Sequence, residues 1–510
     1  MLDNTKFKQL KTGDYANLYN FMRYLPKGGL LHIHLAGAIP VDAIFKNKSK
    51  LYVKMTDTTR GQQLQYSLMT SKEWENHKIN YNLKYKKHKK SAKVTQHIKK
   101  CKKRDKAFRY YKPFVSLSRE DTSAVKDALI FRACGPLHKT TVLFPDYRPT
   151  PYALPQEFSD KFKRLAGLKY DSQLYRSFLA RIMKDAWEDN IEYIELMVNP
   201  FGKIPSDPKG IVNFFGREKD ITKQLLSCRN NYEQFNIDAA VFILKEYIND
   251  VNRFNEKLAD SRQCSIKKCR IQRNFDFLPE SVDVRFLIGL DRTEMAREEK
   301  LDLSFKVVNH FINEEKEERY RNKVLGINLI GNEFGSIGRP FDYFKWIIPE
   351  KKKEYPDVHI TIHAGESAVA DGHVLDSILL GAERIGHGLS LQHGEYTEQI
   401  LKERNICIEA CILSNKLLGY VPCVEKHPAK QWLEKDLKVC LNTDDPGIFD
   451  TRMTDEFYYA TLSFDLSLEL IEQLTLESIK SSFLPEPDKN IRINAFKDKI
   501  SEFYENYELL

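Results

Sequence analysis

Residues 359–388 read HITIHAGESAVADGHVLDSILLGAERIGHG, and this stretch decides the fold class. A short apolar strand at 359–364 is followed by a polar turn, a helical stretch and a second short strand at 383–388. The same succession recurs along the second half of the chain. Strands that alternate with helices favour parallel βα units.

The chain contains eight such strands. They are expected at residues 30–35, 191–198, 285–290, 324–330, 359–364, 383–388, 406–412 and 438–443. Eight βα units predict an α/β fold, a closed (β/α)8 or TIM barrel. One further apolar run, residues 239–247, fits either a helix or an extra strand.

The first two strands are separated by a long gap. The end of the gap, residues 170–190, has the apolar spacing of a helix and is expected to be the first barrel helix. We therefore predict a long insertion after strand 1: residues 1–40 and 151–510 form the barrel domain, and residues 41–150 an insertion lobe. A second insertion is expected near 200–280. Its Cys264 and Cys269 lack the second pair that a zinc knot needs.

The basic character of the chain is local. Segment 84–112 contains fourteen Lys or Arg and one Asp, a charge of +13, so the rest of the chain carries −4 of the total of +9. Such a run is typical of a solvated face or lobe. The alternative is a contact of Lys84–Lys112 with polyanions such as nucleic acid, phosphates or acidic lipids.

Length and composition exclude some classes of protein. The 510 residues are 42% hydrophobic, enough for a large core, yet no stretch approaches the roughly 20 apolar residues of a membrane span. The first twenty residues are polar and lack a signal-peptide core. The nine cysteines, an odd number, indicate reduced thiols. A cytoplasmic protein is expected, export without a visible signal stays open, and the oligomeric state is not indicated.

Histidines and acids gather at the ends of the predicted strands. Side chains at i and i+2 of a strand share a face, so the two histidines of LLHIHL point to one spot. The C-terminal ends of barrel strands form the active-site face. The residues at these ends are His32, His34, His363, Glu366, His387, Asp444 and Asp445.

These residue types suit one chemistry. Three imidazoles and one carboxylate can hold Zn²⁺ and leave a position for water. A metal-bound water loses a proton near neutral pH, and a nearby carboxyl and histidine can move protons. The sequence therefore predicts a hydrolytic site with one zinc ion per chain.

Five blocks resemble, in order, the signatures of the adenosine deaminase family. They are LLHIHLAGAI, GINLIGNE, ITIHAGE, RIGHGL and CLNTDDPGIF, and SSFLPEPDK near the C-terminus is also similar. The resemblance covers roughly residues 20–40 and 170–500. The PKGGLLHIH opening and the long insertion look most like the larger, growth-factor-related subgroup, whose members are typically secreted.

The resemblance implies roles for the residues. Glu366 would give a proton to purine N1, His387 would orient or deprotonate the metal-bound water, Asp445 would bond N7, and the backbone of Gly331 would contact N3. The zinc ligands would be His32, His34, His363 and Asp444. Asp444 also counts among the catalytic residues, and His34 among those that contact substrate. The implied reaction is hydrolytic deamination of adenosine or a related 6-aminopurine nucleoside.

The sugar end departs from the family pattern. Smaller members carry an aspartate two residues after the second histidine, where it meets the ribose 5′-hydroxyl, and the larger subgroup places one directly after that histidine. Here these positions are Ala36 and Leu35. The alternative substrates are therefore 5′-modified adenosines or AMP.

Parts of the sequence are compatible with other classes of protein. The pattern HGE at 393–395 followed by PCVEK at 422–426 resembles the cytidine-type zinc deaminases, but Lys426 stands in place of their second cysteine. A nucleic-acid-binding or receptor-binding protein on a deaminase scaffold is a further alternative, supported by the basic segment. The complete catalytic set argues against an inactive barrel.

Overall fold

The computed structural model describes most of the barrel and parts of the insertion. The described residues are 4–13, 15–47, 51–58, 62–70, 111–113, 117, 119–130, 158, 161–162, 165, 172–203, 224–225, 227, 231–268, 278–293, 297–331, 333, 340–366 and 372–507.

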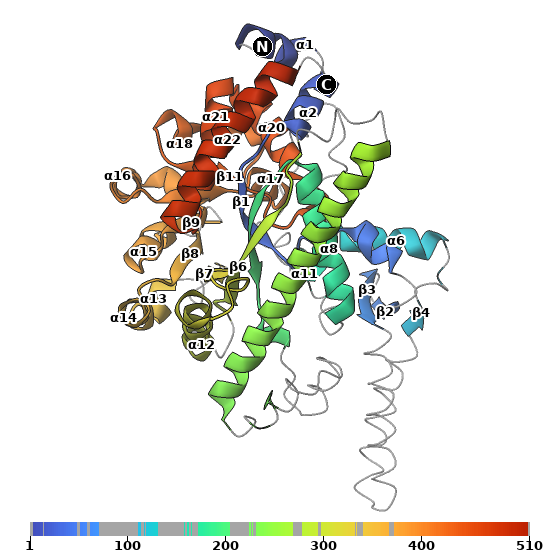
Figure 1. Cartoon of the computed structure of the whole chain (residues 1–510), viewed down its shortest axis with the longest axis vertical. Coiled ribbons are helices and arrows are strands. Elements are labelled where there is room, and N and C mark those ends of the chain that lie inside the picture. Colours follow the sequence, from blue (N-terminus) through green and yellow to red (C-terminus); the bar gives the residue numbers. More distant parts are fainter. Residues whose placement is uncertain are drawn as a thin grey trace, which may run out of the picture.

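Eight parallel strands form one sheet in the order of the chain (Figure 1). They are β1 (Gly29–His34), β5 (Tyr193–Val198), β6 (Asp283–Asp291), β7 (Val324–Ile330), β8 (His359–Ala364), β9 (Arg384–His387), β10 (Cys407–Ala410) and β11 (Val439–Leu441). Most of their residues are buried, as expected for a parallel sheet covered by helices. All eight predicted strands are confirmed.

The two ends of the sheet meet. Ile33 and Asp444 form a parallel bridge, and the amides of His34 and Asp444 donate to the carbonyls of Asp444 and His32, each at 3.1 Å. The side chain of Asn442 accepts bonds from the amides of Leu31 and His32 at 2.8 and 2.9 Å. These contacts join β1 to the end of β11, so the fold is a (β/α)8 barrel.

Helices surround the strands (Figure 1). They include α8 (Ser172–Glu188), α11 (Tyr232–Lys268), α12 (Arg297–Asn309), α13 (Pro340–Phe344), α14 (Ile347–Glu354), α15 (His373–Leu379), α16 (Glu395–Glu403), α17 (Ile412–Leu417), α18 (Ala429–Glu434), α19 (Pro446–Phe449), α20 (Met453–Phe464) and α21 (Leu468–Lys480). Short helical turns are η4 (Phe201–Lys203), η6 (His310–Glu314), η7 (Leu389–His393) and η8 (Val424–Lys426). Helix α8 confirms the helix predicted at the end of the long gap.

The prediction of an insertion near 200–280 is wrong for residues 232–268. They form α11, the helix between β5 and β6, whose buried residues Ala240, Leu244, Ile248 and Val251 belong to the main hydrophobic core. Their spacing follows one face of a helix. The run 239–247 is therefore helical, and Cys264 lies in the same helix, whereas Cys269 lies outside the described residues.

Part of the predicted insertion lobe forms a second sheet. Strands β2 (Leu51–Thr58), β3 (Gln62–Thr70) and β4 (Tyr111–Pro113) pair antiparallel in the order β3-β2-β4. Helices α3 (Val41–Lys46) and α6 (Arg119–Leu129) flank it in the chain. Val125 and Leu129 of α6 are buried in the same hydrophobic cluster as the barrel residues. The basic segment lies outside the described residues except for its last two, and the domain boundaries stay a prediction.

The N- and C-terminal helices pack together at one end of the barrel (Figure 1). They are α1 (Asn4–Gly13), α2 (Tyr15–Tyr24) and α22 (Glu486–Asn506). The Phe21 ring of α2 lies 5.3 Å from the Phe503 ring of α22 and 4.9 Å from that of Tyr507. Within the described part of the chain, no helix combines the length and apolar character of a bilayer span.

Candidate active site

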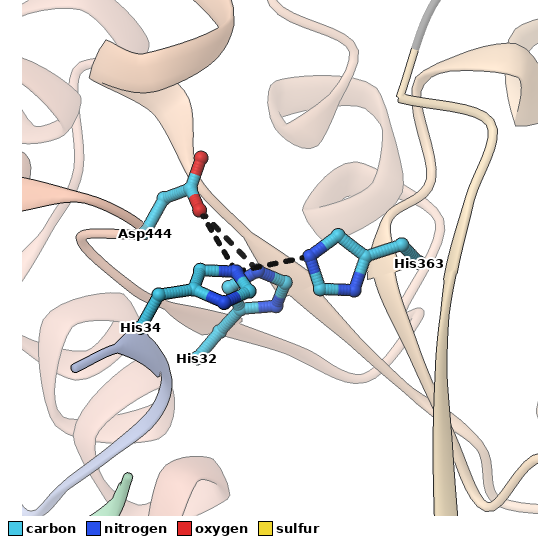
Figure 2. Close-up of side chains that lie close together, drawn as sticks. All are labelled: His32, His34, His363 and Asp444. Carbon is cyan, nitrogen blue, oxygen red and sulfur yellow. Dashed lines mark hydrogen bonds and ion pairs between the residues drawn. The ribbon is translucent and has the colours of Figure 1, made fainter. Parts of the chain in front are cut away.

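Three barrel strands bring the four predicted ligands together (Figure 2). His32 and His34 lie on β1, His363 lies on β8, and Asp444 follows β11. The Nε2 atom of His34 lies 3.1 Å from Nε2 of His363 and 3.3 Å from Oδ1 of Asp444. Nε2 of His32 is 3.6 Å from the same oxygen. One ligand atom of each residue lies within 4.8 Å of the others.

Two of the imidazoles are oriented by partners behind them. Nδ1 of His32 donates to Oε2 of Glu409 at 2.7 Å, and Nδ1 of His363 donates to Oδ1 of Asn328 at 2.9 Å. Glu409 is ionised: burial alone would raise its pKa, but the Arg384 guanidinium lowers it to about 2. With the Nδ1 protons directed outward, Nε2 of each ring faces the centre of the site and is the atom that would bind a metal ion.

The donor set fits a divalent cation. No described residue offers Nε2 of His32 a hydrogen bond, although the atom is buried. Burial alone would lower the pKa of His32, but the carboxylates of Asp444 and Glu409 raise it to about 9, so Nε2 attracts a proton that a metal ion at the site would replace. Burial lowers the pKa of His34 and of His363, as neutral ligands require. Three imidazoles and one carboxylate are a set that zinc accepts.

The backbone around the site is strained. Asp444 has φ of 61° and His387 has φ of 67°, in the left-handed region that costs a non-glycine residue about 1–3 kcal/mol. The backbone bonds of Asp444 to β1 hold this conformation, and the Ser414 hydroxyl donates to its Oδ2 at 2.6 Å. The carboxylate is thereby fixed with Oδ1 toward the histidines.

Glu366 and His387 stand beside the ligands. Oε1 of Glu366 lies 3.9 Å from Nε2 of His387. Burial first, and then the charges of Asp444 and Glu333, raise the pKa of Glu366 to about 8. The carboxyl is therefore protonated at neutral pH and can act as a proton donor.

Glu333 was missed by the sequence analysis. Its carboxylate accepts bonds from the amides of Gly365 and Glu366 at 2.7 and 3.1 Å, and from Nδ1 of His373 at 2.7 Å. It lies in the GNE block whose first residue, Gly331, was predicted to contact substrate. Glu333 fixes the turn that carries Glu366 and adds to the negative field that keeps the Glu366 proton in place.

Asp445 and Gly331, the two further residues predicted to contact substrate, follow β11 and β7. The Asp445 carboxyl is buried, and none of the described side chains or amides bonds its Oδ1. Burial and the charges of Asp444 and Glu366 raise its pKa well above the usual range, so it can donate a hydrogen bond. Gly331 has φ of 102°, and a Cβ there would lie 2.3 Å from Oδ1 of Asp291.

The two positions without the family aspartate differ in their surroundings. Leu35 is buried in the hydrophobic core, and its amide donates to the carbonyl of Met197 at 3.0 Å. Ala36 is half-buried. Neither the leucine nor the alanine side chain can form a hydrogen bond.

The cytidine-type pattern does not assemble in the described part of the chain. Cys423 belongs to none of the metal-capable groups that the described residues form, and Glu395 is exposed at the start of α16. The groups found there instead centre on His32, His387 and Asp444.

Comparisons with known proteins find similarity over the second half of the chain. Residues 290–500 match the family model described as adenosine deaminase. The adenosine deaminase of Aliivibrio fischeri strain MJ11 is 34% identical over 170 residues, which are 33% of this chain and 49% of the relative. That of Enterococcus faecalis is 33% identical over 181 residues, 36% of this chain and 51% of the relative. The chain thus spans about half the length of these curated relatives.

Solved structures share the fold over nearly the whole chain. The N6-methyl-AMP deaminase of Arabidopsis thaliana has a TM-score of 0.54 at 16% identity and covers 94% of this chain and 98% of its own. A zinc-bound cog1816 amidohydrolase from Burkholderia ambifaria has a TM-score of 0.54 at 16% identity, covering 98% and 97%. At this identity the likeness concerns the fold alone.

The matched region contains six of the predicted site residues, Gly331, His363, Glu366, His387, Asp444 and Asp445. The structure places His32 and His34 of β1 beside them, although β1 precedes the matched region. The resemblance to the larger, growth-factor-related subgroup stays a prediction. The similarity to the adenosine deaminase family thus extends over residues 290–500 of the chain.

Proposed function

We propose that this protein is a zinc-dependent aminohydrolase that converts adenosine, or a related 6-aminopurine nucleoside, to the 6-oxo product and releases ammonia. The observation that carries the proposal is the convergence of His32, His34, His363 and Asp444 beside a protonated Glu366. The relatives named adenosine deaminase support the same reaction.

A zinc ion held by these four residues would lower the pKa of a water molecule to about 7 and so supply the nucleophile. Glu366 gives its proton to purine N1, which makes C6 a better electrophile. Asp445 donates a hydrogen bond to N7, and the backbone of Gly331 bonds N3. These contacts orient the base, so water adds at C6 and the amino group leaves as ammonia.

An ammonia-release screen of the purified, zinc-loaded chain tests the proposal. The compounds are adenosine, deoxyadenosine, 5′-methylthioadenosine, AMP, adenine and a short RNA. We expect release from at least one of the nucleosides or AMP, accompanied by the absorbance change of 6-amino to 6-oxo purine. Full zinc occupancy without release from any of them would contradict the proposal.

A second candidate is a deaminase of 5′-modified adenosines or AMP, favoured by Ala36 at the sugar end. Among proteins of the same fold, Arabidopsis structures are described as an N6-methyl-AMP deaminase and as complexes with GMP and IMP. The fold therefore accommodates nucleoside 5′-monophosphates, and the screen separates AMP from adenosine.

The preference for a free 5′-hydroxyl should be weak. A hydrogen bond to a charged group is worth about 1.5–3 kcal/mol, or about 10- to 150-fold in kcat/KM. Without an aspartate at position 36, we expect adenosine and 5′-deoxyadenosine to differ by less than about fivefold. Ala36→Asp should raise the advantage of adenosine. A large advantage in the unsubstituted chain would show that another residue holds the hydroxyl.

Contact of the basic segment with polyanions remains part of the proposal and rests on charge alone. If segment 84–112 serves only as an anchoring lobe, its deletion removes salt-dependent RNA binding and leaves solution turnover intact. A cytoplasmic location likewise stays a prediction.

A further inference from the structure

A series of hydrogen bonds leads to His387 from residues outside the four predicted zinc ligands. The amide of Ala429 donates to Nδ1 of His427 at 3.1 Å. Nε2 of His427 lies 3.1 Å from Oδ1 of Asn415, and Nδ2 of Asn415 lies 3.2 Å from Nδ1 of His387. All of these groups are buried.

The first link fixes the direction of the others. A backbone N–H can only donate, so Nδ1 of His427 is an acceptor and carries no proton. The proton of His427 is then on Nε2 and is donated to Oδ1 of Asn415. The other end of that amide, Nδ2, can only donate, so Nδ1 of His387 is also an acceptor.

Further contacts hold Asn415 and His427 in the positions that these hydrogen bonds require. The backbone of Asn415 is held in α17. Its backbone amide donates to the backbone carbonyl of Cys411 at 3.0 Å, and its backbone carbonyl accepts from the backbone amide of Tyr420 at 3.0 Å. The His427 ring packs edge-on against Trp432, with centroids 5.8 Å apart. Burial, and then the neighbouring His387, lower the pKa of His427 to about 3, so the ring is neutral.

The remaining nitrogen of His387 faces the site. Nε2 of His387 is buried, lies 3.9 Å from Glu366 and has no hydrogen-bond partner among the described residues. A neutral imidazole whose Nδ1 accepts a bond carries its proton on Nε2. The ring therefore presents an N–H to the place where the attacking oxygen would lie.

We propose that Asn415 and His427 are positioning residues that hold the His387 proton on Nε2, so that His387 donates a hydrogen bond to the attacking oxygen and does not remove its proton. The proposal rests on the proposed deaminase function and decides between the two roles, orienting or deprotonating, that the sequence leaves open for His387.

Asn415→Asp separates the two roles because they predict opposite results. A carboxylate has the shape of the amide but accepts on both oxygens, so it draws the His387 proton to Nδ1 and leaves a lone pair on Nε2. If the N–H is needed, kcat falls by about 10²- to 10³-fold with little change in KM, the cost of removing one such donor. Unchanged or higher kcat would overturn the proposal, because a base at Nε2 gains from this change.

Two substitutions at His427 test whether this residue sets the orientation of the Asn415 side chain, and through it the position of the His387 proton. Gln offers both an acceptor for the Ala429 amide and a donor for Asn415, whereas Leu offers neither. We expect His427→Gln to keep kcat within about fivefold and His427→Leu to lose at least about tenfold. Equal kcat for the two variants, both folded by circular dichroism, would contradict a positioning role.

A spectroscopic measurement separates failure of this inference from failure of the proposed function. In the full chain with ¹⁵N-labelled histidine and added Zn²⁺, long-range ¹H–¹⁵N correlations identify the protonated nitrogen of His387, assigned by comparison with His387→Asn. We expect Nε2 to be the protonated nitrogen, and in Asn415→Asp we expect Nδ1. A proton on Nδ1 in the unsubstituted chain overturns the inference whether or not ammonia is released. Absence of ammonia release with the proton on Nε2 contradicts only the deaminase function.

Discussion

Replacing Glu366 by glutamine should lower kcat for ammonia release by about 10²- to 10⁴-fold, the usual contribution of a general acid. Glutamine keeps the shape of the side chain but has no acidic proton to give to purine N1. Glu366 lies outside the group formed by the three histidines and Asp444, so zinc content measured by elemental analysis should stay at one per chain.

The matched control is Glu395→Gln, a change of the same chemistry at an exposed position at the start of α16. Its kcat should stay within about twofold, since surface substitutions have small effects. If Glu366→Gln retained turnover, Glu366 would have no part in the mechanism. If that variant lost its zinc, Glu366 would be a zinc ligand.

The proton on Glu366 also predicts the direction in which kcat/KM changes with pH. Because Glu366 acts in its protonated form and its pKa is raised to about 8, kcat/KM should fall as the pH rises through that pKa. The positive charge of a bound ion moves this fall to lower pH, never to higher pH. A kcat/KM that keeps rising above pH 9 would contradict the assignment.

Replacing Arg384 by methionine should have the largest effect on stability, a loss of about 3–5 kcal/mol in the free energy of unfolding. Arg384 is buried inside the barrel, and its guanidinium donates to Glu409 and to Glu195, each at 2.6 Å. Methionine removes the cation and leaves two buried carboxylates without it. Urea unfolding followed by circular dichroism measures the loss.

A double variant tests whether charge is the cause. Adding Glu195→Gln to Arg384→Met removes one of the two uncompensated carboxylates, so the double variant should be more stable than the single one. The Arg384 guanidinium also packs over the Phe483 ring, 3.6 Å from its centroid. If this packing were the only role of Arg384, Glu195→Gln would restore no stability. Such a result would contradict the electrostatic explanation.

The sequence could predict what depends on local pattern. The apolar strands, their alternation with helices and the placement of His32, His34, His363 and Asp444 at strand ends all follow from short stretches, and the structure brings those four residues together. The helix α8 was predictable for the same reason. Helix α11 was left open between a helix and a strand, because residues 239–244 are apolar at every position and so show no helical period.

The partners behind the site left no local signal. Glu409 of β10 bonds His32, and Arg384 of β9 bonds Glu409. Asn415 bonds His387, and His427 bonds Asn415, both from segments that follow β10. Each is an ordinary polar residue in its own stretch of sequence. Only the closed barrel makes them neighbours, so their roles could not be derived from spacing.

The most direct measurement is the location and amount of metal in the purified full chain after incubation with excess Zn²⁺. Elemental analysis combined with anomalous X-ray scattering at the zinc edge gives both. We predict one zinc ion per chain, bound by His32, His34, His363 and Asp444. A zinc ion held elsewhere, or these four side chains without metal under saturating Zn²⁺, would contradict the proposed deaminase mechanism at its starting point.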